Sequence, residues 1–117
     1  MSRSLRVYIA SSFEQKSAVR RTYKLFIKQG HVITADWTVH TEIAALSNKH
    51  EQEDLRKQYS IEDAEGVRSA EVFVLLPGKR KSTGAHIELG IALGAKVPNI
   101  FIVSKQLDIQ LFYHSAN

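Results

Sequence analysis

Residues 71–76 read EVFVLL and contain five consecutive apolar side chains, most of them β-branched or aromatic. Such a run predicts a short strand that is buried on both faces, as in a parallel sheet covered by helices. A loop, PGKRKSTG at 77–84, and a mostly apolar helix at 85–95 follow it. Strand, loop and helix in this order form the repeating unit of a parallel α/β sheet.

The same order recurs on both sides of this segment. Further strands are expected at 5–10, 31–35 and 99–103. Further helices are expected at 13–29, 51–69 and, as a short final element, 107–113. Gly30 supplies a helix stop, and Gly66 weakens its helix by ~1 kcal/mol relative to alanine. We therefore predict an α/β, Rossmann-like (flavodoxin-like) three-layer fold with a four- to five-stranded parallel sheet, in which residues 1–117 form one domain.

The composition is that of an ordinary globular protein, with 44% hydrophobic and 24% charged residues. Cysteine is absent, which excludes disulfides, thiolate metal sites and cysteine nucleophiles. No stretch approaches the ~18 apolar residues of a membrane span, and the apolar run at 7–10 is too short for an export signal. We expect a complete, cytoplasmic protein that does not bind a membrane.

The formal net charge of +4 is compatible with nucleic acid or with phosphorylated small molecules as ligands. The basic residues are densest at 20–28 and at 79–81. They are not interspersed with the aromatic residues on which single-strand binders stack bases, and no nucleic-acid recognition motif accompanies them. Nucleic-acid binding is therefore the interpretation we rank last. The five histidines show no metal-binding spacing, so neither a metal nor another cofactor is expected.

Glu88 is the first candidate for chemistry. It lies near the start of an apolar helix that follows a strand's carboxyl end, where α/β proteins bind ligands. An acid at a helix start can simply stabilise the helix dipole, by ~0.3–1 kcal/mol. The apolar surroundings would instead tune the carboxylate for reaction by raising its pKa. Both interpretations stay open on position alone.

Asp63 and Tyr8 are weaker candidates. Asp63 belongs to an acidic run that is typical of a solvated helix face, but it stands next to the apolar stripe of its helix. Tyr8 lies within the first strand, where its hydroxyl needs a hydrogen-bond partner if it is buried. Core packing is the ordinary explanation for such a tyrosine.

Candidate ligand contacts follow three of the predicted strands. Ser11 and Ser12 end the first strand, and Trp37 lies just past the second. Ser82 and Gly84 open the helix that carries Glu88. Backbone N–H groups at a helix start suit an anion, although 77–84 is not a Gly-x4-Gly-Lys-Ser/Thr phosphate loop.

Three segments together resemble the nucleoside 2-deoxyribosyltransferase family, and most closely its branch of 2'-deoxynucleoside 5'-phosphate N-hydrolases. They are the strand and turn VYIASSF at 7–13, Asp63 placed eight residues before the strand at 71–74, and STGAHIELG at 82–90. The resemblance spans about residues 5–104. It implies an enzyme that cleaves or exchanges the bond between a base and its sugar, with a small nucleoside or nucleotide as substrate.

The resemblance also implies residue roles. Glu88 would attack the anomeric carbon and form a glycosyl ester. Retaining glycosidases likewise use two carboxyl groups, one of them as the nucleophile. Asp63 would assist departure of the base or hold the sugar, and Tyr8 would orient Glu88 by a hydrogen bond. Water would resolve the ester in a hydrolase, and a second base in a transferase.

Ser82 helps to choose between the two branches. The transferases carry an aspartate six residues before the nucleophile, whereas the hydrolases have a serine there, at the phosphate. With the cationic run 79–81 nearby, this favours hydrolysis of a 5'-monophosphate. The family completes its sites across a subunit interface, so a homodimer or larger homo-oligomer is implied. Candidates for the residue that reaches across are Tyr113, His114 and Asn117.

Three alternatives remain open beside this interpretation. The chain could be a nucleoside 2-deoxyribosyltransferase proper, which would form new nucleosides only when an acceptor base is present. It could be an NAD-type glycohydrolase, which would release nicotinamide instead of a nucleobase. It could also be a non-catalytic nucleotide-binding module, in which replacing Glu88 by alanine would leave every function intact.

Overall fold

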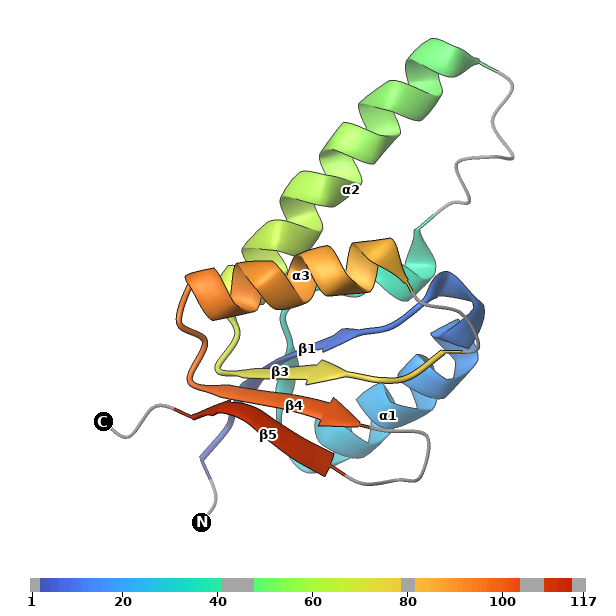
Figure 1. The fold of residues 1–117 in the computed structure, drawn as a ribbon. Coiled ribbons are helices and arrows are strands. Elements are labelled where there is room, and N and C mark those ends of the chain that lie inside the picture. Colours follow the sequence, from blue (N-terminus) through green and yellow to red (C-terminus); the bar gives the residue numbers. More distant parts are fainter. Residues whose placement is uncertain (1–2, 41–47, 79–81, 104–108, 115–117) are drawn as a thin grey trace.

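The computed structural model describes residues 3–40, 48–78 and 82–103, and the backbone alone of residues 109–114. In that part of the chain, five strands form one sheet and three helices pack around it (Figure 1). The strands are β1 (Arg6–Ala10), β2 (Val32–Ile33), β3 (Val72–Leu75), β4 (Asn99–Val103) and β5 (Ile109–His114). The helices are α1 (Lys16–Lys28), α2 (Lys49–Ser69) and α3 (Thr83–Gly94), with 3-10 turns η1 (Phe13–Gln15) and η2 (Trp37–Val39).

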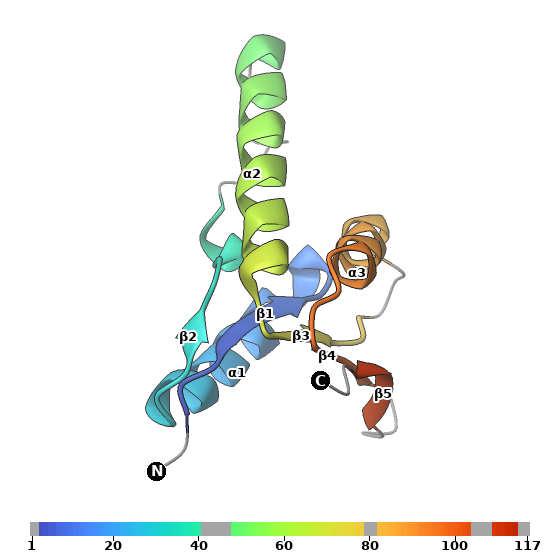
Figure 2. The ribbon, with the colours of Figure 1, turned by 90° about the vertical axis from the view of Figure 1, so that its left-hand side faces the viewer.

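The strand order in the sheet is β2-β1-β3-β4-β5. β1 pairs in parallel with β2 and with β3, and β3 pairs in parallel with β4. Figures 1 and 2 show α1 on one face of the sheet, and α2 and α3 on the other. The predicted Rossmann-like, flavodoxin-like α/β fold is thus confirmed. Its strand order reverses between β1 and β3, which is where such sheets bind ligands, beyond the carboxyl ends of the strands.

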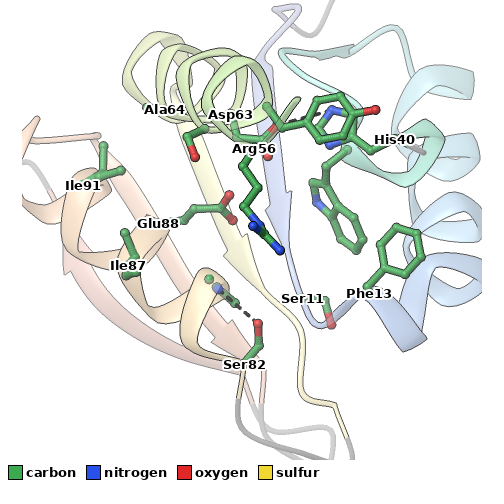
Figure 3. Close-up of a pocket in the computed structure, with 15 residues that line it drawn as sticks. Ser11, Phe13, His40, Arg56, Asp63, Ala64, Ser82, Ile87, Glu88 and Ile91 are labelled. Carbon is green, nitrogen blue, oxygen red and sulfur yellow. Dashed lines mark hydrogen bonds and ion pairs between the residues drawn. The ribbon is translucent and has the colours of Figure 1, made fainter. Parts of the chain in front are cut away.

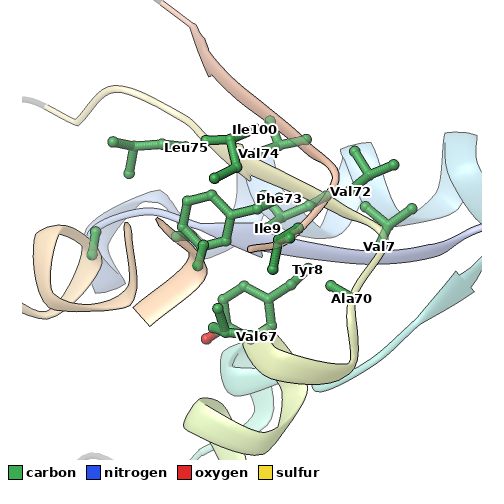
Figure 4. Close-up of a cluster of buried hydrophobic side chains, with 14 of the residues drawn as sticks. Val7, Tyr8, Ile9, Val67, Ala70, Val72, Phe73, Val74, Leu75 and Ile100 are labelled. Carbon is green, nitrogen blue, oxygen red and sulfur yellow. The ribbon is translucent and has the colours of Figure 1, made fainter. Parts of the chain in front are cut away.

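Tyr8 of β1 and Phe73 of β3 lie at the centre of the core (Figure 4). They are paired in register, and their rings stack with centroids 5.9 Å apart and an interplanar angle of 5°. Every residue of β3 is buried, as is β1 from Val7 onward. The prediction that 71–76 contains a strand buried on both faces is therefore confirmed.

α2 packs against β1 at Gly66. A Cβ added to Gly66 would lie 2.5 Å from Cβ of Ala35 and 3.2 Å from Cδ2 of Tyr8, so a larger residue does not fit without movement. The glycine that weakens the predicted helix is thus the point at which the helix approaches the sheet. The N-terminal turns of α2 extend beyond the sheet (Figures 1 and 2).

The last described element differs from the prediction. The short helix expected at 107–113 is wrong, because Ile109–His114 form β5, antiparallel to β4. The sequence from Leu107 to Gln110 alternates apolar and polar residues with the period of a strand, and β4 offers a free edge for pairing. Residues 107 and 108 themselves lie outside the described part.

Other predicted elements have different ends: β1 begins at Arg6, β3 covers Val72–Leu75, and α3 covers Thr83–Gly94. β2 covers only Val32–Ile33 of the strand expected at 31–35, and the helix expected at 13–29 is divided into η1 and α1. Gly30 follows α1 with φ of 90°, as predicted for a helix stop. α2 begins earlier than expected, because Asn48 caps it by accepting hydrogen bonds from the backbone of residues 50 and 51. None of the helices in the described ranges combines the length and apolar character needed to cross a membrane.

Candidate active site

A cleft of about 580 Å³ lies where the strand order reverses, between the carboxyl ends of β1 and β3, α2 and the start of α3 (Figure 3). Its volume is in the range of small-molecule sites. Its lining includes six polar or aromatic residues from several elements: Ser11, Trp37, His40, Asp63, Ser82 and Glu88. Five of these six were predicted from the sequence, and the fold brings them into one cleft.

Tyr8 and Glu88 are joined directly. The hydroxyl of Tyr8 donates a 2.8 Å hydrogen bond to Oε2 of Glu88. Tyr8 is fully buried, and burial, followed by the nearby carboxyl groups of Glu88 and Asp63, raises its pKa far above the ordinary value. The tyrosine therefore stays protonated and always acts as the donor, which orients the Glu88 side chain.

Glu88 projects from the second turn of α3 into the cleft (Figure 3). Burial raises its pKa to about 7, the hydrogen bond from Tyr8 lowers it, and the nearby Asp63 raises it. A carboxyl group that titrates near neutral pH is reactive in either form, as a nucleophile when ionised or as an acid when protonated. The other interpretation of Glu88, as a charge that only stabilises the helix dipole, does not account for its half-buried position in the cleft.

Asp63 lies on α2 and lines the same cleft from another side. Burial raises its pKa to about 6, while the imidazole of His40 lowers it and Glu62 raises it. The Nε2 atom of His40 lies 3.8 Å from Oδ1 of Asp63. The cleft thus contains two half-buried carboxyl groups with raised pKa values. Carboxyl groups of this kind can act as acids, bases or nucleophiles near neutral pH.

The start of α3 forms the end of the cleft beneath Glu88. Ser82 is the N-cap residue, and its Oγ accepts a hydrogen bond from the backbone N–H of Ala85 at 3.1 Å. Gly84 is exposed and lines the cleft beside it. Ser11 stands opposite, with its hydroxyl donating to the carbonyl of Leu76 at 3.1 Å. The N-terminus of α3 therefore opens into the cleft, where it suits an anionic group.

Aromatic side chains form the wall of the cleft that faces α3. Trp37 of η2 is buried, and its Nε1 donates a 2.7 Å hydrogen bond to the carbonyl of Ile9. The Phe13 ring lies next to it, with centroids 6.3 Å apart. The two rings are tilted by 45° to each other, and an apolar aromatic wall of this kind suits a planar ring as ligand.

The cleft also contains residues that were not predicted as site residues, among them Phe13, His40, Arg56 and Tyr59. His40 lies three residues after Trp37, in the segment past a strand end that the sequence marks for binding. Arg56, Tyr59 and Asp63 follow a spacing of three and four, which places them on one helix face. That spacing is the signal that could have led from Asp63 to the other two.

One predicted contact residue, Ser12, lies outside the cleft, and other predicted residues fall outside the part of the chain that the structure describes. The hydroxyl of Ser12 instead contacts Oε1 of Glu14 at 3.3 Å. Residues 79–81 and Asn117 lie outside the described residues, and Tyr113 and His114 belong to β5, whose side chains are not described. Within the described ranges, no group of three or more acidic or histidine side chains could hold a metal ion.

The sequence matches no known family model and none of the curated proteins. Among solved structures, the chain is similar to the CMP N-glycosidase BcmB of Clostridium botulinum, with a TM-score of 0.52 and 20% sequence identity. The similarity covers 83% of this chain and 69% of that chain. At this identity the likeness establishes a shared fold, and function has to be argued from the site.

Proposed function

We propose that this protein cleaves the N-glycosidic bond of a nucleoside or its 5'-monophosphate, with Glu88 as nucleophile and water as the favoured acceptor. The observation that carries the proposal is the hydrogen bond from buried Tyr8 to Glu88, in a cleft that also holds Asp63. It is the arrangement that the resemblance to the nucleoside 2-deoxyribosyltransferase family implies. The fold shared with a CMP N-glycosidase supports the same choice.

In the first step, the ionised carboxylate of Glu88 attacks the anomeric carbon of the sugar. Tyr8 holds Oε2, so Oε1 is the attacking oxygen. The bond between carbon and base nitrogen breaks, and its electron pair leaves with the base. Asp63 in its protonated form gives the base a proton, and the sugar remains on Glu88 as an ester. The reacting form is thus the singly protonated pair with its proton on Asp63, which is the less populated arrangement because the pKa of Asp63, about 6, lies below that of Glu88, about 7.

In the second step, a water molecule attacks the same carbon. Asp63, now ionised, takes a proton from that water, and the ester bond to Glu88 breaks with its electron pair returning to the carboxylate. The products are the free base and the free sugar or sugar phosphate, and both carboxyl groups regain their starting states. A second base in place of water would make the reaction a transfer.

The cleft supports a substrate with an anionic end and a planar end. The start of α3, with Ser82 as its cap, and Ser11 would take the phosphate of a 5'-monophosphate. Trp37 and Phe13 would cover the base on the opposite wall. We assign the sugar to the space between them, next to Glu88.

The test is a panel of nucleosides, 5'-monophosphates and NAD, incubated with the purified protein with and without a free acceptor base. Base release from monophosphates by the wild type and not by Glu88→Ala would establish the hydrolase. New nucleosides that form only with acceptor base would establish a transferase, and nicotinamide release an NAD glycohydrolase. Ligand binding by both proteins without any turnover would overturn the proposal in favour of a binding module.

A further inference from the structure

His40 and Asp63 form a half-buried pair in the wall of the cleft. Nε2 of His40 lies 3.8 Å from Oδ1 of Asp63, and the two side chains are 16% and 17% exposed. This distance is too long for a hydrogen bond. Oδ1 is a buried oxygen without a hydrogen-bond partner among the described residues. The two groups therefore act on each other through charge, with little water between them to screen it.

The imidazole of His40 is held in a fixed plane by Tyr59. The two rings stack with centroids 3.7 Å apart and an interplanar angle of 4°. Tyr59 and Asp63 lie one turn apart on α2, so a single helix supplies both the stacking surface and the carboxyl group. The histidine cannot turn away from Asp63 without losing this stack.

The main chain before His40 is anchored as well. Oδ1 of Asp36 accepts a 2.9 Å hydrogen bond from the backbone N–H of Thr38 and thereby caps η2. The guanidinium of Arg20, on α1, donates to the side chain and the carbonyl of Thr38 at 3.0 and 2.8 Å. α1, η2 and α2 thus all contribute to the position of one imidazole.

A second cavity of about 420 Å³ meets the cleft at this pair. It lies between the end of β2 and α2, and His40 and Asp63 line both spaces. Several titratable or charged groups surround the pair. They are Asp36, Arg56, Tyr59, Glu62, Glu65, Tyr8, Tyr23 and Glu88, with Arg20 behind η2. Among them, Glu88 and Tyr8 belong to the reaction already proposed.

We propose that His40 is the positioning residue of Asp63, and that its charge sets how firmly Asp63 keeps the proton that it gives to the leaving base. The inference rests on the proposed function. A protonated His40 stabilises the carboxylate of Asp63 and so opposes proton donation, whereas a neutral His40 leaves the proton on Asp63. An ionised Asp63 in turn disfavours the ionised form of Glu88, because the two negative charges repel each other.

The test follows the titration of the Asp63 carboxyl carbon by NMR, which needs no substrate. His40→Gln removes the charge, and His40→Phe removes it while keeping a ring to stack on Tyr59. We expect both variants to raise the pKa of Asp63 by about 1 pH unit, since the partner that lowers it is gone. An unchanged Asp63 titration in both folded variants would overturn the inference.

The chain offers a matched control in His50 and Asp54. Their Nε2 and Oδ2 atoms lie 3.9 Å apart, close to the distance in the His40 pair, but the side chains are 85% and 73% exposed. His50→Gln should leave the Asp63 titration unchanged. A shift as large as in His40→Gln would mean that the Asp63 titration reports general charge and not this contact.

Kinetics provide the second readout. On the alkaline side, kcat/KM falls because the form with its proton on Asp63 is lost. A higher pKa of Asp63 should move this limb to higher pH in His40→Gln, and the limb should be absent in Asp63→Asn. A limb that stays in place while kcat falls at every pH would assign His40 a purely structural role and contradict the inference. If no substrate is turned over but the NMR shift is present, the proposed reaction fails while the coupling of the pair stands.

Discussion

The hydroxyl of Tyr8 donates a 2.8 Å hydrogen bond to Glu88, 80 residues further along the chain. The bond joins the central strand of the core to the helix that borders the cleft, so the orientation of the carboxylate depends on core packing. Tyr8 is itself stacked on Phe73, which leaves its ring little freedom to move. The geometry of Glu88 is thus set before any substrate binds, as catalysis by a positioned group requires.

Tyr8→Phe should lower kcat/KM by about 10- to 100-fold, the range expected for losing a hydrogen bond of ~1.5–3 kcal/mol to a charged group. Because this bond lowers the pKa of Glu88, its loss should also move the acid limb of the pH–rate profile to higher pH. Steady-state rates between pH 5 and 9 would measure both effects.

Tyr23→Phe is the matched control for that experiment. The hydroxyl of Tyr23 is also buried, but it has no hydrogen-bond partner among the described residues. Removing it should leave kcat/KM and the acid limb unchanged and should not destabilise the fold. A loss of activity as large as in Tyr8→Phe would show that the effect is not specific to the bond with Glu88.

Glu88→Gln should be more stable than the wild type at alkaline pH. The folded protein holds the pKa of Glu88 at about 7, above its ordinary value, so the folded state binds this proton more tightly than the unfolded state. The stabilisation of the folded state by this bound proton is fully present near pH 4 and is lost as pH rises through 7. Denaturation at pH 8 should favour the variant by on the order of 2–3 kcal/mol, with little difference at pH 4. Equal stabilities at pH 8 would contradict the burial of this carboxylate.

Gly66→Ala should destabilise the protein by about 1–3 kcal/mol and reduce activity, because the new methyl group meets Ala35 and the ring of Tyr8. Gly90→Ala on α3 is the control, since nothing lies within 4 Å of a Cβ there. In a helix interior the same change is expected to stabilise by up to ~1 kcal/mol. Thermal melts measure both effects, and a Gly66→Ala variant that melts at or above the wild-type temperature would contradict the close packing of α2 on β1.

Ser82→Asp tests the phosphate contact. Aspartate caps a helix as well as serine does, so the stability of α3 should be kept. Its negative charge should repel a 5'-monophosphate and lower the rate on that substrate by at least about tenfold, while nucleosides are spared. Ser82→Ala, which removes the cap without adding charge, separates the two effects. Equal losses on nucleosides and monophosphates would place the phosphate elsewhere.

The fold was largely predictable, because its signals are local. Two features of the sequence predict the parallel sheet. They are the apolar run at 71–76 and the alternation of strands and helices. The error at 107–113 has a physical cause: the strand-like alternation covers only residues 107–110, and pairing with the free edge of β4, which the sequence does not show, completes the strand.

The candidate site was predictable in part. Glu88, Asp63 and Tyr8 could be selected from an apolar helix, a spacing and a family resemblance. His40 follows Trp37 in the segment past a strand end, but its pairing with Asp63 and Tyr59 could not be predicted, because these residues lie 23 and 19 positions further along the chain. The closeness of Gly66 to Tyr8 likewise results from how α2 packs on β1. The sequence alone shows only a glycine within a predicted helix.

The most direct test of the central claim compares base release by the wild type and by Glu88→Gln on the best substrate of the panel. Glutamine keeps the shape of the side chain and an acceptor for Tyr8, but it cannot act as the nucleophile. We predict that the wild type releases the base and carries the sugar transiently on the peptide that contains Glu88, and that the variant does neither although it folds and binds. Base release by Glu88→Gln at the wild-type rate would contradict the account.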